Sequence, residues 1–354
     1  MSRSARTRLA VASVFAAVAG ASLVSAGAPA GAAAPPDPTV LADGLLAPLS
    51  IATDGGAVYY NDGFQGKIYK VGTEAPIVDG GGKEIQGLSL DGADLIYTLG
   101  KKIIRRTPQG DTTVLASLFS YEKANNPDGD VKYGLGPVSK SCLSKWPDHF
   151  FPPKYTGIVE SHPYGTAVDG STVYVADAAA NAILAINDGV VSTVAVLPVV
   201  RATLTKQMAK EWGVKLPDCV IGKTFKFEGV PTDVEVGPGG LLYVSSLPGG
   251  EVQGKGRILT IDPATGEVTK VLGGLSGATG VAVTPTGDIY ATQLFGGTIT
   301  VKPAGGSATT FAQAPLPAAV EVVGNALYAS INTLPQDDTS PPAGQVVSYN
   351  LALP

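Results

Sequence analysis

Short apolar runs, each broken by a glycine- or proline-containing turn, recur along almost the whole chain. In one example, residues 229–246, a first apolar run ends at Val236, a Gly/Pro turn follows, and a second run closes on Tyr243 and Val244. This alternation predicts two strands joined by a tight turn. The same phrase returns at residues 163–177 and 279–292. The chain is therefore predicted to be built from repeated hairpins.

Six copies of the repeat can be aligned on a tyrosine in the second run: Tyr59, Tyr97, Tyr174, Tyr243, Tyr290 and Tyr328. A third apolar run follows each tyrosine, and five copies also show a fourth run. The uninterrupted copies are spaced by 38 residues (Tyr59 to Tyr97) to 47 residues (Tyr243 to Tyr290). Four antiparallel strands at this period predict an all-β fold, a six-bladed β-propeller of four-stranded blades. Seven blades is the alternative count.

The sixth copy lacks an outer strand because the chain runs out soon after Tyr349. Residues 39–42, an apolar run near the N-terminus, are predicted to supply that strand and to close the ring. Closure removes the unpaired strand edges that an open array would expose.

Two connections are too long for a bare blade, and they define insertions at about residues 120–159 and 198–227. Each joins the outer strand of one blade to the inner strand of the next, so both are expected on one face, at the mouth of the central channel. Cys142 lies in the first insertion and Cys219 in the second, and these are the two cysteines of the chain. We predict a disulfide that links the insertions into a lid. Residues 203–213 are predicted to form an amphipathic helix that packs onto the propeller.

The first 32 residues have the pattern of a secretory signal peptide: three arginines, an apolar run, and small residues at Ala30 and Ala32. Residues 33–354 are then one domain, expected to be secreted, extracellular and monomeric, with no membrane span. Without the leader the chain carries 22 basic and 30 acidic side chains, a net charge of −8. That charge argues against a nucleic-acid partner.

Several segments resemble the ScyD/ScyE family, secreted propeller proteins named for genes of cyanobacterial scytonemin clusters. The segments that carry the resemblance are residues 121–129, 160–165, 204–208, 230–238 and 243–249. One departure is His162, where the family more often has Asn. The resemblance implies a six-bladed propeller but no settled reaction.

A more distant resemblance connects the chain to NHL-type and gluconolactonase-type propellers, whose metal sites lie at the channel mouth. There a Pro-Asn-Gly turn supplies an amide ligand, whereas this chain has Tyr164 between Pro163 and Gly165. The substitution removes an oxygen ligand and argues against a lactonase-like metal site.

Candidate site residues are the polar side chains predicted at the channel mouth. Asp233 is the one charged residue at a shared position of the six inner strands, and Glu228 and Glu160 precede inner strands. Further candidates are His162, Tyr164 and Asp177. Such carboxylates can bind Ca²⁺, a cationic ligand or a hydroxyl-rich ligand. The alternative for Asp177, and for Asp62, is a structural hydrogen bond to the next turn.

No complete nucleophile–base pair, metal set or nucleotide loop is visible. Residues 125–130 have the composition of a calcium loop without its spacing and are interpreted as a turn. Aromatic residues of the first insertion either line a recess for an apolar ligand or anchor the lid. The favoured function is a non-enzymatic module that binds a small molecule, glycan or extracellular protein. The alternatives are a metal-dependent lactonase or lyase that uses Glu160, His162, Glu228 and Asp233, and an extracellular scaffold.

Overall fold

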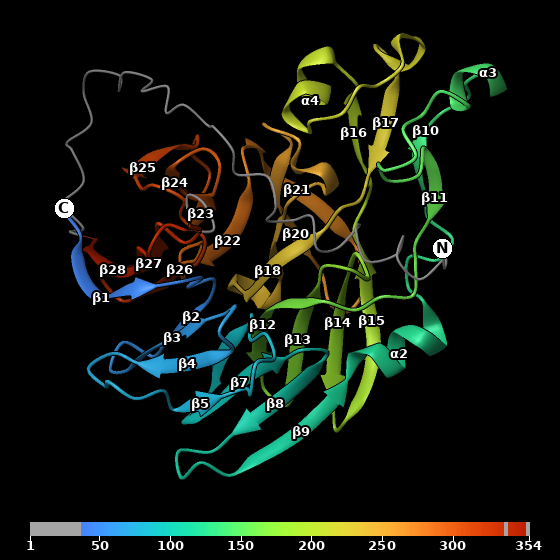
Figure 1. Ribbon diagram of the computed structural model, residues 1–354. Coiled ribbons are helices and arrows are strands. Elements are labelled where there is room, and N and C mark those ends of the chain that lie inside the picture. The colour runs from blue at the N-terminus through green and yellow to red at the C-terminus, as the bar shows by residue number, and fades with distance from the viewer. Residues whose placement is uncertain (1–36, 336–338, 352–354) are drawn as a thin grey trace.

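The computed structural model describes residues 37–335 and 339–351, and the predicted signal peptide lies outside them. The described chain forms seven four-stranded antiparallel sheets (Figure 1). The first strands of six sheets contact one another in succession, and the last of them, β26, returns to β2. A separate hydrophobic cluster lies between each pair of consecutive sheets. We assign these six sheets as the blades of the ring.

The blades follow the order of the chain. The first consists of β2 (Ile51–Thr53), β3 (Val58–Asp62), β4 (Lys67–Lys70) and β5 (Val78–Asp79). The second consists of β6 (Leu88–Asp91), β7 (Asp94–Leu99), β8 (Lys102–Arg106) and β9 (Thr112–Ser117). The third consists of β12 (Pro163–Asp169), β13 (Thr172–Asp177), β14 (Ala182–Asn187) and β15 (Val190–Val196).

The other three blades have the same order of strands. The fourth consists of β18 (Pro231–Val236), β19 (Leu242–Ser246), β20 (Gly256–Ile261) and β21 (Val268–Leu275). The fifth consists of β22 (Ala278–Val283), β23 (Ile289–Gln293), β24 (Thr298–Lys302) and β25 (Thr309–Gln313). The sixth consists of β26 (Val320–Val323), β27 (Ala326–Ile331), β28 (Gly344–Asn350) and β1 (Thr39–Leu45).

The six aligned tyrosines all fall in second strands, where they pack between blades. The predicted closure of the ring is also confirmed. β1 pairs antiparallel with β28, with Thr39 opposite Ser348 and Leu45 opposite Gly344. Figure 1 shows this blue strand beside the red strands of the sixth blade.

The seventh sheet is built from the two insertions and was not predicted from the sequence. The first insertion supplies β10 (Lys132–Leu135) and β11 (Lys154–Thr156), and the second supplies β16 (Val200–Thr203) and β17 (Thr224–Phe227). The strand order is β11-β10-β17-β16, so the two insertions meet at the β10–β17 pairing. We call this sheet and its helices the lid. In Figure 1 it stands at one side of the six blades.

Short helices complete the insertions. They are α2 (Leu118–Asn125), α3 (Lys140–Leu143), α4 (Lys206–Glu211) and the 3₁₀ turn η2 (Asp218–Val220). Two further 3₁₀ turns lie in the fourth blade, η3 (Pro238–Gly240) and η4 (Gly249–Glu251). The predicted amphipathic helix is shorter than expected: Thr205 caps its start by accepting the Met208 N–H (3.1 Å), and Gly213, at φ +64°, follows its end.

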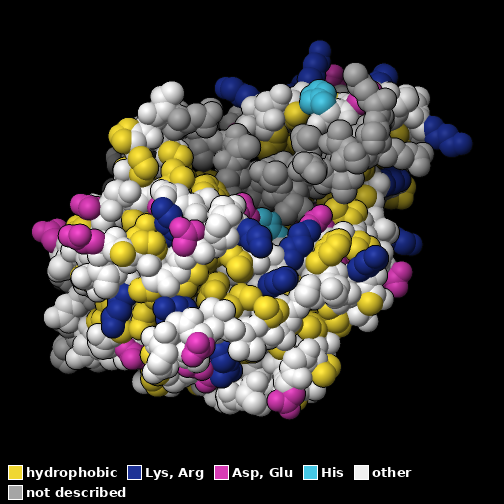
Figure 2. Space-filling model, turned by 60° about the horizontal axis from the view of Figure 1, so that its bottom comes forward, with side chains coloured by type: hydrophobic (Ala, Val, Ile, Leu, Met, Phe, Trp, Pro, Cys, Tyr) yellow, Lys and Arg dark blue, Asp and Glu magenta, His cyan; other side chains and the backbone are white. Residues whose placement is uncertain are grey.

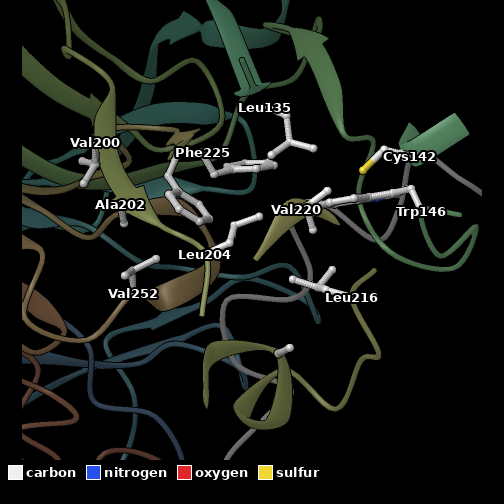
Figure 3. Packing of buried hydrophobic residues seen from close by; sticks show 12 residues of the cluster. Leu135, Cys142, Trp146, Val200, Ala202, Leu204, Leu216, Val220, Phe225 and Val252 are labelled. Carbon is white, nitrogen blue, oxygen red and sulfur yellow. The ribbon is translucent and has the colours of Figure 1, made fainter. Parts of the chain in front are cut away.

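The lid has its own apolar core. Figure 3 shows Leu135, Phe225 and Val220 directed toward one another, with Trp146 and Cys142 approaching from the first insertion. The Trp146 and Phe225 rings are stacked with centroids 6.2 Å apart. Because the insertion aromatics Trp146, Phe150 and Phe151 all pack around this core, they form the body of the lid.

The predicted disulfide is present and joins Cys142 of α3 to Cys219 of η2. It links residues 77 apart in the sequence, so the chain-entropy estimate of its stabilisation is about 4 kcal/mol. The crosslink lies within the lid, whereas β1 and β28 close the ring. Loss of the disulfide should therefore weaken the lid before the blades.

Replacing both cysteines with serine is expected to make residues 130–156 and 200–227 exchange amide hydrogens and undergo protease cleavage much faster. The blades should keep their protection, since their hydrogen bonds do not depend on the lid. Hydrogen exchange read by mass spectrometry distinguishes the two regions. Equal loss of protection in the lid and in β13–β14 would contradict this division.

Candidate functional site

The chain enters the third blade through a turn that a buried aspartate holds in place. Asp177, at the end of β13, accepts hydrogen bonds from the Ser161 hydroxyl (2.6 Å), the His162 N–H (2.7 Å) and the Ala180 N–H (3.3 Å). Burial raises the pKa of this carboxyl, and these hydrogen bonds oppose the rise. Asp62 serves the first blade in the same way by accepting the Leu46 and Ala47 N–H groups. Both carboxylates therefore make structural hydrogen bonds to backbone N–H groups, which the sequence analysis gave as the alternative to ligand binding.

The turn that Asp177 supports places His162 beside two other side chains. His162 Nε2 lies 3.1 Å from Glu84 Oε2, and its ring centroid is 4.7 Å from that of Tyr164. The approach of the His162 ring lowers the pKa of Glu84 against the opposing effect of burial, so Glu84 stays ionised at neutral pH. Burial raises the pKa of Tyr164, which keeps its hydroxyl protonated. The three residues form a polar and aromatic group between the second and third blades.

Glu160 lies at the edge of this group and pairs with Lys101. The Lys101 ammonium also lies 4.3 Å from the centroid of the Phe119 ring, which is 38% exposed. Both charged side chains are partly open to solvent. The Lys101–Glu160 pair therefore lies at the solvent-exposed edge of the group formed by Glu84, His162 and Tyr164.

Glu251 is a site residue that sequence reasoning missed. It ends η4, a turn after β19, and has a positive φ of 51°, which is costly for a residue with a side chain. Its Oε1 is buried and has no hydrogen-bond partner. Burial raises the pKa of Glu251 to about 8, and its charge in turn raises the pKa of Tyr164. Glu251 is therefore close to Tyr164 and largely protonated at neutral pH.

The lid reaches the η4 turn directly. Trp212, which follows α4, donates its indole N–H to the Gly250 carbonyl oxygen (2.8 Å), and Val252 belongs to the lid core. Glu228 lies on the other side of the turn and accepts the Gly249 N–H on its backbone oxygen (3.1 Å). Burial and the Asp128 charge raise the pKa of Glu228 to about 7, against a hydrogen bond with Asn181. Glu228 and Glu251 thus flank one turn beneath the lid.

Asp233 lies on β18 and is held by backbone hydrogen bonds. Its Oδ1 accepts the Val234 N–H (2.9 Å), and its Oδ2 accepts the Val281 N–H of the next blade (3.0 Å). Burial raises the pKa of Asp233 to about 7 despite these bonds. Gly165 is required beside it, because a Cβ there would come within 2.8 Å of Asp233 Oδ1.

Two further channel carboxyls, Glu235 and Glu321, interact with Asp233. Burial, mutual repulsion and the Asp233 charge raise the pKa of Glu235 well above its usual value, and burial raises that of Glu321. The two glutamates share a hydrogen bond, so one carboxyl of the pair holds a proton. Each lies opposite the second-strand tyrosine of its blade, Tyr243 or Tyr328. If the repeats are aligned by the residue that each inner-strand position faces on the second strand, Glu235 and Glu321 occupy the same position. Alignment by sequence spacing does not show this.

The structure thus divides the predicted site residues among three places. His162 and Tyr164 lie together with Glu84, Glu228 lies beside the η4 turn, and Asp233 belongs to the channel. Within residues 37–335 and 339–351, no three His, Cys, Asp or Glu side chains are placed to hold one metal ion.

The surface is mixed in charge. Figure 2 shows Lys and Arg side chains near the middle of one face, beside a histidine and with acidic side chains interspersed. In the described part of the chain, no helix is both long enough and apolar enough to span a membrane.

Comparison with known proteins supports the fold. No family model and no curated protein matches the chain. Among solved structures, it is similar to a putative gluconolactonase (14% identity, TM-score 0.52, covering 91% of this chain and 93% of that one). It is also similar to the calcium-binding protein regucalcin from Agrobacterium tumefaciens (11% identity, TM-score 0.51, covering 86% and 92%). These neighbours are β-propellers, and at this identity the likeness shows the fold alone.

A third similar structure is the PQQ-bound aldose sugar dehydrogenase from Streptomyces coelicolor (12% identity, TM-score 0.51, covering 89% and 99%). The three proteins named here differ in what their descriptions say they do. The chain is therefore a β-propeller, and its function has to be argued from its own residues.

Proposed function

We propose that this protein is a secreted, ScyD/ScyE-like binding module that holds a small hydroxyl-rich or amine-bearing ligand beneath the lid. The proposed site consists of Glu84, His162, Tyr164, Glu228 and Glu251, which we call the mouth site. The signal-like leader and the disulfide support the extracellular location. The segments that resemble ScyD/ScyE proteins support the family.

Glu251 is the observation that carries this proposal. A buried acceptor without a donor costs about 1–3 kcal/mol, and a strained backbone costs a similar amount. Glu251 combines both, since its Oε1 is buried without a partner and its φ is 51°. A ligand that donates a hydrogen bond to Oε1 would recover part of that cost.

The neighbouring groups fit the same class of ligand. Glu84 and Glu228 offer carboxyl oxygens, and the adjacent His162 and Tyr164 rings offer flat surfaces. Carboxyls accept hydrogen bonds from hydroxyls and ammonium groups, while aromatic faces pack against sugar rings and cations. An anionic ligand would meet repulsion at this site.

Thermal shift against polyols, monosaccharides, oligosaccharides and amines should identify compounds that raise the unfolding midpoint of the full mature chain. Affinity for such a compound is expected to fall at least 10-fold in Glu251→Ala and in His162→Ala, measured by calorimetry. Glu267→Gln, at an exposed turn, is the matched control and should bind normally. Unchanged affinity in both site variants would remove the mouth site from the proposal.

A second candidate is an acid–base enzyme at the same place, and the His162–Glu84 pair favours it. An ionised Glu84 can orient His162 as a general base, while a protonated Glu251 can act as an acid. Turnover of a lactone or ester that His162→Ala and Glu84→Gln both reduce at least 100-fold would favour this function. Binding without turnover would favour the module.

A further inference from the structure

A second polar site adjoins the mouth site, where the first insertion leaves the second blade and packs on the third. It consists of Glu122 on α2, Asn126 at the end of that helix, and Asp128 in the following turn; we call it the junction site. The three residues come from one short segment, and Glu122 and Asn126 are one helical turn apart. The Tyr121 hydroxyl bonds to Thr193 Oγ1 of β15 (2.8 Å), which fixes α2 against the third blade.

The junction site contains four buried oxygens without a donor. Glu122 and Asp128 have no exposed surface, and neither Oε1 nor Oε2 of Glu122 has a hydrogen-bond partner. Asp128 Oδ1 and Asn126 Oδ1 are also buried and unpaired. Each such oxygen costs about 1–3 kcal/mol, more when it is charged. Four together require an explanation.

The donors near Asp128 and Asn126 are already engaged, and the Glu160 backbone N–H is the donor that lies near Glu122. The Tyr133 hydroxyl (2.9 Å) and the Asn181 amide (2.8 Å) both donate to Asp128 Oδ2, which leaves Oδ1 without a partner. Asn126 directs its amide N–H toward the Gly157 carbonyl at 3.5 Å. The side chain of Asp128 lies so close to Gly157 that a Cβ there would come 1.8 Å from Oδ1. The turn is therefore held in place with its acceptor oxygens unsatisfied.

Charge adds to the same problem. The Asp177, Asp128 and Glu160 carboxylates act on Glu122, and Asp177 also acts on Asp128. The principal charges acting on both groups are therefore other carboxylates. Positive charge at the junction site would relieve this repulsion.

We propose that the junction site binds a hard divalent cation, Ca²⁺, through the carboxylate of Glu122, the amide oxygen of Asn126 and Oδ1 of Asp128. Carboxylate and amide oxygens are typical Ca²⁺ ligands, and the absence of sulfur and imidazole from this set disfavours Zn²⁺. Ca²⁺ tolerates irregular geometry and takes further backbone oxygens and waters, whereas Mg²⁺ requires a near-ideal octahedron. Two carboxylates and an amide would supply part of the roughly six to eight oxygens that Ca²⁺ takes.

The cation would stabilise the root of the first insertion. Asp128 also bonds to Asn181, whose Oδ1 accepts the Val230 N–H (3.0 Å) at the end of the second insertion. The junction site thus adjoins both insertions where they join the blades. This role differs from ligand binding at the mouth site, whose Glu228 lies within reach of the Asp128 charge.

The test is a calcium titration of the chelator-treated, dialysed mature protein, followed by thermal unfolding and calorimetry. Ca²⁺ is expected to raise the midpoint by several degrees, since a ligand of the native state stabilises it by mass action. Mg²⁺ at the same concentration should give a smaller shift. Glu122→Gln and Asp128→Asn should each reduce the Ca²⁺ shift at least fivefold, while Asp130→Asn, exposed in the same loop, should retain it.

Two outcomes would overturn the proposal. One is the absence of any Ca²⁺ response in the chelator-treated wild-type protein, which would mean that protonation or water satisfies these oxygens. The other is a Ca²⁺ shift that persists in both Glu122→Gln and Asp128→Asn, which would place the ion elsewhere. Near-UV circular dichroism checks that the variants fold. Glu122→Gln removes a buried charge, so it should fold even if Asp128→Asn does not.

Discussion

A chain that begins at residue 46, and so lacks β1, is expected to lose its cooperative unfolding transition or to aggregate. β1 supplies the outer strand of the sixth blade, and Leu41 and Leu45 pack between the sixth and first blades. The loss of two leucines, at about 1.5–3 kcal/mol each, and of several strand hydrogen bonds totals on the order of 5 kcal/mol. That is a large part of the stability of an ordinary domain. Removal also exposes β28 as an edge.

A chain that begins at residue 37 retains β1 and is the matched control, expected to unfold cooperatively. Adding a peptide of residues 37–46 to the shorter chain should restore part of the lost stability, because the peptide can pair with β28. Denaturant unfolding and size-exclusion chromatography measure both effects. A truncated chain as stable as the control would show that β1 is dispensable.

The second large effect is a fall in stability as the pH rises. Folding raises the pKa of Asp233 from 3.8 to about 7 and also raises those of Glu235 and Glu321. The folded state therefore binds more protons than the unfolded state between these values. The stability from these groups is fully present below about pH 4 and is lost as the pH rises through 7 and beyond. For Asp233 alone the loss is on the order of 4 kcal/mol.

Glu321→Gln should flatten this dependence and leave the protein more stable than wild type at pH 8, because an amide can donate to Glu235 without carrying charge. Glu267→Gln, at an exposed turn, should follow the wild-type curve. Urea unfolding at several pH values between 4 and 9 measures the slope. The channel carboxyls would not be the cause of the pH dependence if wild-type stability increased from pH 5 to pH 8 in the same buffer series and Glu321→Gln gave the same curve.

Strand periodicity, the second-strand tyrosines, the closing strand and the disulfide could all be predicted from the sequence. Each depends on a local signal: alternation, turn residues, an apolar run near the N-terminus, or a count of two cysteines. The β10–β17 pairing could not be predicted, because it joins two segments about 90 residues apart in the chain. The insertion aromatics were ambiguous for the same reason, since whether they line a recess or build a core depends on that sheet.

The candidate site was predicted only in part. His162 and Tyr164 are two residues apart in the sequence, so a correct position for one brings the other close to it. Glu84 and Glu251 lie in connections that belong to two other blades. They come close to Tyr164 only because the propeller brings those blades together. The important property of Glu251 is its positive φ angle. The preceding glycines, Gly249 and Gly250, indicate a turn but do not determine that angle.

The lid and the channel are joined by a very short piece of chain. β17 ends at Phe227 and β18 begins at Pro231, so Glu228, Gly229 and Val230 alone separate the lid sheet from the inner strand that carries Asp233. Val230 has a positive φ of 29°, and its N–H is tied to Asn181. A force that tilts the lid would therefore be transmitted to β18 with little loss, because the linker is too short to absorb it. β15 of the third blade and β16 of the lid are also only three residues apart, so a mechanical load applied to the lid should reach the third blade and the strand that carries Asp233 together.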